Sequence, residues 1–100
     1  MTYPQRSPID SLLAALGDPT RRAVFEAIVA QPGITTSQLT SRAPAITRWA
    51  VMKHLVVLRD AGLIQTMATG RLRRHYAEQA ALGPLRDWLD RTTSGARAGT

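Results

Sequence analysis

Arginine is concentrated in the middle of this chain of 100 residues. From Arg42 to His75 the sequence has seven cations and one anion, a net charge of +6. The cations are Arg42, Arg48, Lys53, Arg59, Arg71, Arg73 and Arg74, and the anion is Asp60. The rest of the chain carries six cations and six anions, so the formal charge of +6 comes entirely from this segment. A local basic patch is typical of a surface that binds nucleic-acid phosphates, the alternative being a solvated basic face without a partner.

The other residue types that could do chemistry argue against catalysis and metal binding. The sequence has no cysteine, which excludes disulfides, thiolate metal sites and thiol nucleophiles. His54 and His75 lie among basic residues, and neither has a second metal ligand at a useful spacing. Asp87 and Asp90 have the spacing of an ordinary helix-surface pair, and no phosphate-binding glycine loop is present. We therefore expect no enzyme activity, no catalytic residues, no metal site and no cofactor.

The basic segment spans two kinds of expected structure, a helix and a hairpin. Apolar periodicity and turn residues predict helices over about 7–17, 18–31, 35–43, 47–61 and 79–91. Gly83 and Pro84 interrupt the last pattern, so this helix is expected to begin either near Gln79 or near Gly83. Residues 63–67 and 72–76 are compatible with strands, and the Thr69–Gly70 turn between them predicts a hairpin.

Polar residues at the expected helix ends support these boundaries. Asp18 precedes Pro19, an arrangement typical of a helix start. Thr35 and Gln38 match a capping box, Thr47 is placed to cap the fourth helix, and Gly62 is expected to end it in a left-handed conformation.

This order of elements predicts a winged helix-turn-helix, a mainly α fold with a small β-hairpin wing. The short third helix, tight connection and basic fourth helix form the helix-turn-helix, and the basic hairpin forms the wing.

The length fits one domain, which we place at 7–91 between a flexible N-terminus (1–6) and a flexible tail (92–100). No apolar run is long enough for a membrane span, and residues 1–10 have no apolar signal segment, so a cytoplasmic protein is expected.

The fourth helix has an unusual outer face. At 100° per residue, Val51, His54, Leu55 and Leu58 share the core side, and Trp49, Met52, Lys53 and Val56 gather on the opposite side. An exposed apolar stripe usually marks a contact surface. Two alternatives remain open: Trp49 folds back into the domain, or the Trp49, Met52 and Val56 stripe binds another protein instead of DNA.

We expect the fourth helix to enter a DNA major groove. Arg48 is placed to bond guanine O6 and N7, Lys53 to contact guanine or phosphate, and Trp49 to meet a thymine methyl. Strand alternation puts Arg71, Arg73 and His75 on one side of the wing and Arg74 on the other, with Leu72 and Tyr76. The candidate DNA-binding residues are Thr36, Ser37, Thr47, Arg48, Trp49, Met52, Lys53, Arg71, Arg73 and Arg74.

Three segments together resemble the ArsR-type winged helix-turn-helix repressors of prokaryotes. They are LGDPTRRAVFEAIV at Leu16–Val29, RWAVMKHLVVLRDAGLI at Arg48–Ile64 and TGRLRRHY at Thr69–Tyr76. The resemblance covers about residues 9–91 and implies a dimeric repressor that binds double-stranded DNA. Metal-sensing members carry paired cysteines in the third helix, or His and acidic ligands on the last helix. This sequence has neither set, so we expect no metal sensing, and the inducer is unknown.

The resemblance also implies a homodimer joined through the first and last helices. The apolar residues that these helices supply for an interface are Ile9, Leu12, Leu13, Leu16, Leu85, Trp88 and Leu89, and packing in the core of one chain is the alternative for each. A two-fold dimer presents two recognition helices about 34–36 Å apart, so the operator is expected to be an imperfect palindrome.

Overall fold

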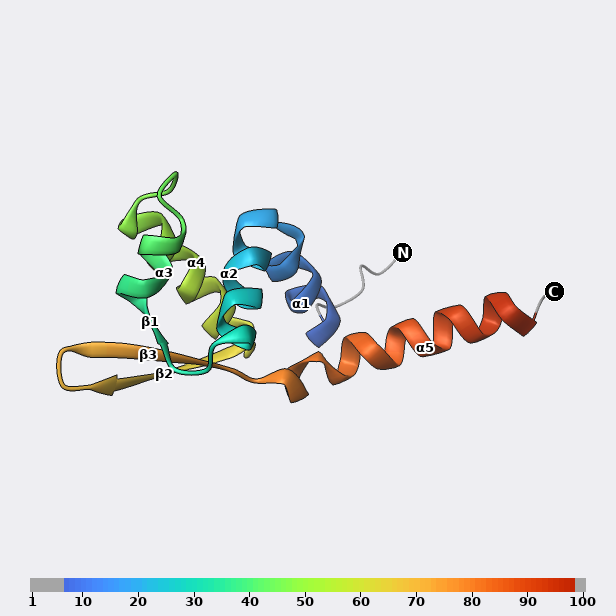
Figure 1. The fold of residues 1–100 in the computed structure, drawn as a ribbon. Coiled ribbons are helices and arrows are strands. Elements are labelled where there is room, and N and C mark those ends of the chain that lie inside the picture. The colour runs from blue at the N-terminus through green and yellow to red at the C-terminus, as the bar shows by residue number, and fades with distance from the viewer. Residues whose placement is uncertain (1–6, 99–100) are drawn as a thin grey trace.

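The computed structural model describes residues 7–98, with side chains through residue 94. The predicted flexible N-terminus, 1–6, lies outside the described residues. The elements in chain order are α1 (Pro8–Gly17), α2 (Pro19–Ala30), β1 (Ile34–Thr35), α3 (Thr36–Arg42), α4 (Arg48–Asp60), β2 (Ile64–Thr69), β3 (Leu72–Ala77), the 3₁₀ helix η1 (Gln79–Leu82) and α5 (Gly83–Ala98). The predicted fold class is confirmed: α2, α3 and α4 lie on one side of a small sheet, whose β2–β3 hairpin is the wing (Figure 1).

The helix ends are set by the side chains that the sequence indicates. The carboxylate of Asp18 accepts from the backbone N–H of Arg21 at 2.8 Å, and Thr35 and Gln38 form a reciprocal capping box. At the start of α4, Thr47 Oγ1 accepts from the backbone N–H of Ala50 at 3.0 Å. Gly62, which follows α4, has a φ of 77°, the left-handed conformation expected there.

Two arginines of the DPTRR segment close the end of α1. Arg21 donates from Nε to the carbonyl of Ala15 at 2.6 Å and from Nη2 to that of Ala14 at 3.0 Å. Arg22 donates from Nη1 to the carbonyl of Leu16 at 2.7 Å. The last carbonyls of a helix have no partner within it, and a cation beside them also stabilises the helix dipole. These two cations therefore fix the corner between α1 and α2.

The sheet contains a strand that we did not predict from the sequence. The strand order is β1-β3-β2, both pairs being antiparallel, with Ile34 opposite His75 and Thr66 opposite His75 on the other side. β1 has only two residues, too few for an alternating pattern to be recognised. It is stabilised by its pairing with β3, and Gly33 before it has a φ of 84° and lies against the Tyr76 ring. The third strand ties the wing to the start of α3.

One hydrophobic core lies between the helices and the sheet. Its members are Leu12, Ala15, Val24, Phe25, Ile28, Ile34, Leu39, Val51, Leu55, Leu58, Leu63 and Ile64. Because α4 contributes Val51, Leu55 and Leu58, the predicted core face of this helix is confirmed. No helix in residues 7–98 is long and apolar enough to cross a membrane.

Helix α5 projects from the body of the domain, as Figure 1 shows, and runs on to Ala98. It begins at Gly83 after η1, the later of the two predicted starts. The predicted helix end at Arg91 is wrong, because residues 92–98 continue the helix. The flexibility predicted for 92–100 stays a prediction, and its residues 99–100 lie outside the described residues. The radius of gyration is 16.1 Å, larger than the roughly 13 Å of a compact chain of this length.

Candidate nucleic-acid interface

The outer face of α4 is not covered by the other described elements of the domain. The Trp49 side chain is 67% exposed, and Met52 and Val56 are also exposed. The Lys53 ammonium lies 4.1 Å from the centroid of the Trp49 ring, a cation–π contact that holds both side chains on the surface. The alternative in which Trp49 folds back into the domain is therefore wrong. An apolar stripe flanked by cations remains available to a partner.

The start of α4 meets the start of α3 and the wing. Arg48 Nη1 donates to Ser37 Oγ at 3.2 Å, a contact between the two helices of the helix-turn-helix. A small hollow of about 90 Å³ beside this contact is also lined by Arg71 and Arg73 of the wing. Arg48, Arg71 and Arg73, all predicted to bind DNA, thus line one hollow, although 23 residues separate Arg48 from Arg71 in the sequence.

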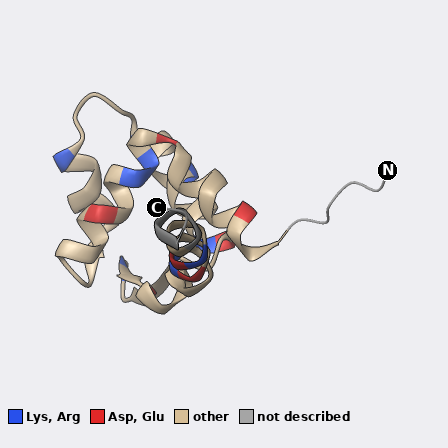
Figure 2. Ribbon diagram, turned by 90° about the vertical axis from the view of Figure 1, so that its right-hand side faces the viewer, with Lys and Arg blue, Asp and Glu red and all other residues tan. Residues whose placement is uncertain are grey.

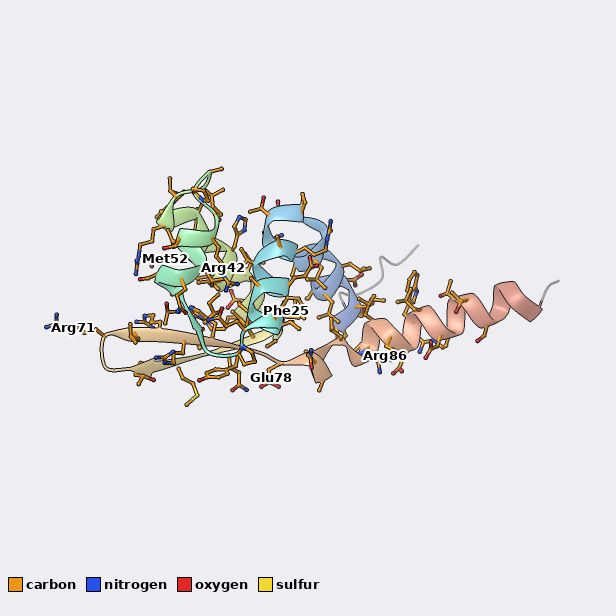
Figure 3. The ribbon with its side chains drawn as sticks, in the orientation of Figure 1. Phe25, Arg42, Met52, Arg71, Glu78 and Arg86 are labelled. Carbon is orange, nitrogen blue, oxygen red and sulfur yellow. The ribbon has the colours of Figure 1, made fainter. Side chains whose placement is uncertain are left out.

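The wing arginines divide between the two faces of the hairpin. Arg71 stands at the free end of the hairpin, away from the body of the domain (Figure 3). Arg73 lines a cavity with α4. Arg74 belongs to the opposite face by strand alternation and donates from Nη1 to the carbonyl of Gly33 at 3.1 Å. The contact of Arg74 is thus within the protein, and it ties the wing to the loop before β1.

His75 lies on the same face of the wing as Arg73, as strand alternation predicts, but its side chain is buried. Its side chain is 1% exposed and lies between two threonines. Thr36 Oγ1 is 2.8 Å from Nε2, and Thr66 Oγ1 is 2.9 Å from Nδ1. Burial lowers the pKa of His75, and the nearby guanidinium groups of Arg59 and Arg73 lower it further. A neutral imidazole suits this arrangement, since one nitrogen donates and the other accepts.

Thr36, one of the predicted phosphate ligands, is buried in the structure. Its side chain is 5% exposed, and its hydroxyl is engaged by His75. Position at the start of a helix suggested an exposed hydroxyl, but Thr36 faces the sheet, whereas its neighbour Ser37 is exposed. We call Thr36, Thr66 and His75 the threonine–histidine cluster. It joins α3 to both strands of the wing and so fixes the relative position of the two elements.

Opposite charges are mixed outside this region. Figure 2, which views the molecule along α5, shows both basic and acidic residues on that helix. Among the described residues, no group of three His, Asp or Glu side chains is close enough to hold a metal ion.

The terminal helices have exposed apolar side chains, but not all of those that we predicted for an interface. Leu13, Trp88 and Leu89 are exposed. Ile9, Leu16 and Leu85 are partly buried, the two leucines against the core of their own chain. Leu12 is 2% exposed and belongs to the core, so its prediction as an interface residue is corrected.

Comparison with known proteins agrees with this geometry. Residues 16–66, from the end of α1 into β2, match a family model described as a helix-turn-helix domain. The HTH-type transcriptional regulator Rv2034 of Mycobacterium tuberculosis is 36% identical over 94 residues, covering 94% of this chain and 85% of that protein. An ArsR-like transcriptional regulator from Rhodococcus sp. RHA1 is 30% identical with a TM-score of 0.77, covering 91% of this chain and 84% of that one. A second solved structure, the ArsR family transcriptional regulator RHA00566, is 28% identical with a TM-score of 0.84 and covers 99% of this chain and all of that one.

The fold and the match to the helix-turn-helix model define a winged helix-turn-helix protein, a DNA-binding transcriptional regulator. Within that class, the chain belongs to the ArsR-like family of transcriptional regulators, and its partner is double-stranded DNA.

Proposed function

We propose that this protein is a homodimeric repressor that binds an imperfect DNA palindrome. The observation that carries the proposal is that Arg48 of the recognition helix lines one hollow together with Arg71 and Arg73 of the wing. In a winged helix the recognition helix and the wing contact DNA separately, so both must be held in a fixed relative position to bind one DNA site. Here we expect the threonine–histidine cluster and the Arg48–Ser37 contact to hold them in that position.

The contacts divide into those that read bases and those that bind the backbone. Arg48, Trp49 and Met52 lie on the first turns of α4, the part of a recognition helix that is nearest the base edges. Lys53 reaches guanine or phosphate from beside Trp49. Arg71, Arg73 and Ser37 contact phosphates, and Arg71 at the wing tip also reaches a minor groove. Thr47 already caps α4, so we assign the phosphate contact there to the neighbouring backbone N–H groups.

The dimer uses the exposed apolar side chains of α1 and α5. Leu13, Trp88 and Leu89 form the centre of this interface, with Ile9, Leu16 and Leu85 at its inner edge. Because α5 projects beyond its own domain, a second α5 is a suitable partner for its apolar side. Two-fold symmetry then places the two recognition helices about one turn of DNA apart, roughly 34–36 Å.

We infer that the protein acts in the cytoplasm, where its DNA lies, and that it is not an enzyme. Release from DNA does not use a metal ion, because the sequence lacks the cysteines and the histidines on the last helix that metal-sensing relatives use.

Footprinting of the protein on the DNA upstream of its own gene tests the proposal. We expect protection of two half-sites on one face of the duplex, with centres about 10 base pairs apart. Transcription from that promoter is expected to fall when the protein is added. A uniform pattern without protection at low salt contradicts sequence-specific binding, and increased transcription contradicts repression.

A further inference from the structure

An open cavity of about 360 Å³ lies between α4 and the wing. Its size falls within the roughly 300–1,000 Å³ that is typical of sites for small molecules. Met52, Leu55 and Val56 of α4 provide an apolar floor, and the threonine–histidine cluster forms a polar wall opposite. Since the cluster bonds both nitrogens of His75 internally, that wall is rigid and presents little unused hydrogen-bonding capacity.

Three arginines surround this floor without a counterion. Arg48 and Arg59 come from α4 and Arg73 from β3, and none of the described side chains that line the cavity is acidic. Arg59 and Arg73 are close enough to the imidazole to lower the pKa of His75. Like charges held together repel one another, and an anion among them relieves that repulsion.

The apolar floor distinguishes this site from a simple phosphate site. A free phosphate ion satisfies the arginines but leaves the exposed side chains of Met52 and Val56 in water. A ligand that has both an anionic head and a flat apolar body uses both features, because arginine forms paired hydrogen bonds with a carboxylate. Burial of the body against the floor adds stabilisation in proportion to the apolar area removed from water.

We propose that this cavity binds a small aromatic or acyl carboxylate, and that such a ligand releases the protein from DNA. The second part rests on the proposed function, since Arg48, Met52 and Arg73 are also placed at the DNA. A ligand that engages these three side chains cannot be bound together with the operator. The cavity would thus supply a route of release that needs neither cysteine nor metal.

Titration of the free protein with sodium naphthoate, followed by amide NMR chemical shifts, tests the site directly. We expect saturable shifts centred on Met52, Val56, Thr66 and Arg73. Naphthylmethanol keeps the ring but lacks the charge, and we expect it to bind at least about tenfold more weakly. Inorganic phosphate keeps a charge without the ring and is expected to cause no saturable change on the α4 floor.

Two matched variants separate a built site from general attraction to a basic protein. Arg59→Gln removes one cation of the cavity, and we expect naphthoate binding to weaken by about tenfold. Arg86→Gln removes one cation of equal charge from α5, which does not line the cavity and which Figure 3 places on the other side of the domain from Arg71 at the wing tip, and we expect no change in naphthoate binding. Equal binding of naphthoate and naphthylmethanol, or equal weakening by both variants, overturns the inference.

Competition with DNA completes the test. Naphthoate is expected to release labelled upstream DNA from the protein at the concentration that saturates the NMR shifts. Naphthylmethanol at the same concentration is expected to release no DNA. Saturable naphthoate binding to a protein that binds no duplex DNA contradicts the proposed function and leaves the cavity assignment standing. Firm DNA binding without saturable naphthoate binding contradicts the cavity assignment alone.

Discussion

The basic segment 42–75 and the corner between α1 and α2 use arginine in different ways. In the basic segment, the guanidinium groups of Arg71 and Arg73 make no hydrogen bond with another described residue, although both line one hollow with Arg48. In the α1–α2 region, Arg21 and Arg22 donate hydrogen bonds to three backbone carbonyls of α1. Arginine therefore stabilises the fold in the α1–α2 region, as Arg74 also does at the base of the wing, whereas Arg71 and Arg73 are left free for a partner.

The exposed apolar side chains of α4 and of α5 differ in the charges around them. The apolar residues that α4 exposes lie beside cations, with Trp49 stacked against Lys53. Those that α5 exposes, Trp88 and Leu89, belong to a helix of mixed charge that extends past its own core. The first pattern suits a polyanion that also presents base edges and methyl groups. The second suits another copy of the same helix.

The largest effect is expected from separating the two halves of the dimer. Leu89→Asp places a charge in the proposed interface, and we expect a monomer by analytical ultracentrifugation. Loss of two-site binding should then lower operator affinity by roughly 10²- to 10⁴-fold. Asp90→Asn, on the other side of α5, is the control and should remain dimeric. A dimeric Leu89→Asp protein with normal affinity would show that α5 is not the interface.

The next effect is expected from the residue assigned to base reading. Arg48→Ala should lose about 1–3 kcal/mol of operator binding and relax the preference at one base pair. Affinities for all single-base variants of the operator measure both quantities. Arg86→Ala on α5 is the matched control and should change neither. If Arg48→Ala weakens every sequence equally, as a phosphate ligand would, our assignment of Arg48 is wrong.

Arg21, which bonds the last carbonyls of α1, should affect the stability of the fold and not the recognition of DNA. Arg21→Ala leaves the last carbonyls of α1 without their partner, and we expect a loss of about 1–3 kcal/mol in the free energy of unfolding by urea. Operator preference at a temperature where the variant is folded should equal that of the wild type. A changed base preference would mean that the two uses of arginine are not separate.

A smaller effect is expected from the buried His75. Because its pKa is lowered in the folded state, the unfolded chain binds the proton first as the pH falls below about 6.5. The contribution of neutral His75 is fully present above that pH and is lost as the pH falls toward the folded-state pKa. We expect wild-type stability to decrease between pH 7.5 and 5.5 more than that of His75→Gln. The same decrease in both proteins would contradict this role.

Local signals in the sequence predicted the starts of α2, α3 and α4, the end of α4 and the exposed stripe, because these features depend on residues close together in the chain. The caps at Thr35 and Thr47 and the turn at Gly62 are of this kind. Long-range contacts explain the errors. β1 is too short to form a strand without β3, and Thr36 and His75, 39 residues apart, are buried by each other. Leu12 and Leu13 are adjacent, and only the packing of α1 decides that the first is core and the second exposed.

The salt dependence of binding to upstream DNA tests the central claim, that segment 42–75 binds the DNA backbone, most directly. If about six phosphates are contacted, affinity should fall by about 10³-fold between 50 and 200 mM salt. Arg73→Ala should make the slope of log affinity against log salt shallower by about one. An affinity that does not change with salt would contradict the account, because binding would then not depend on phosphate contacts.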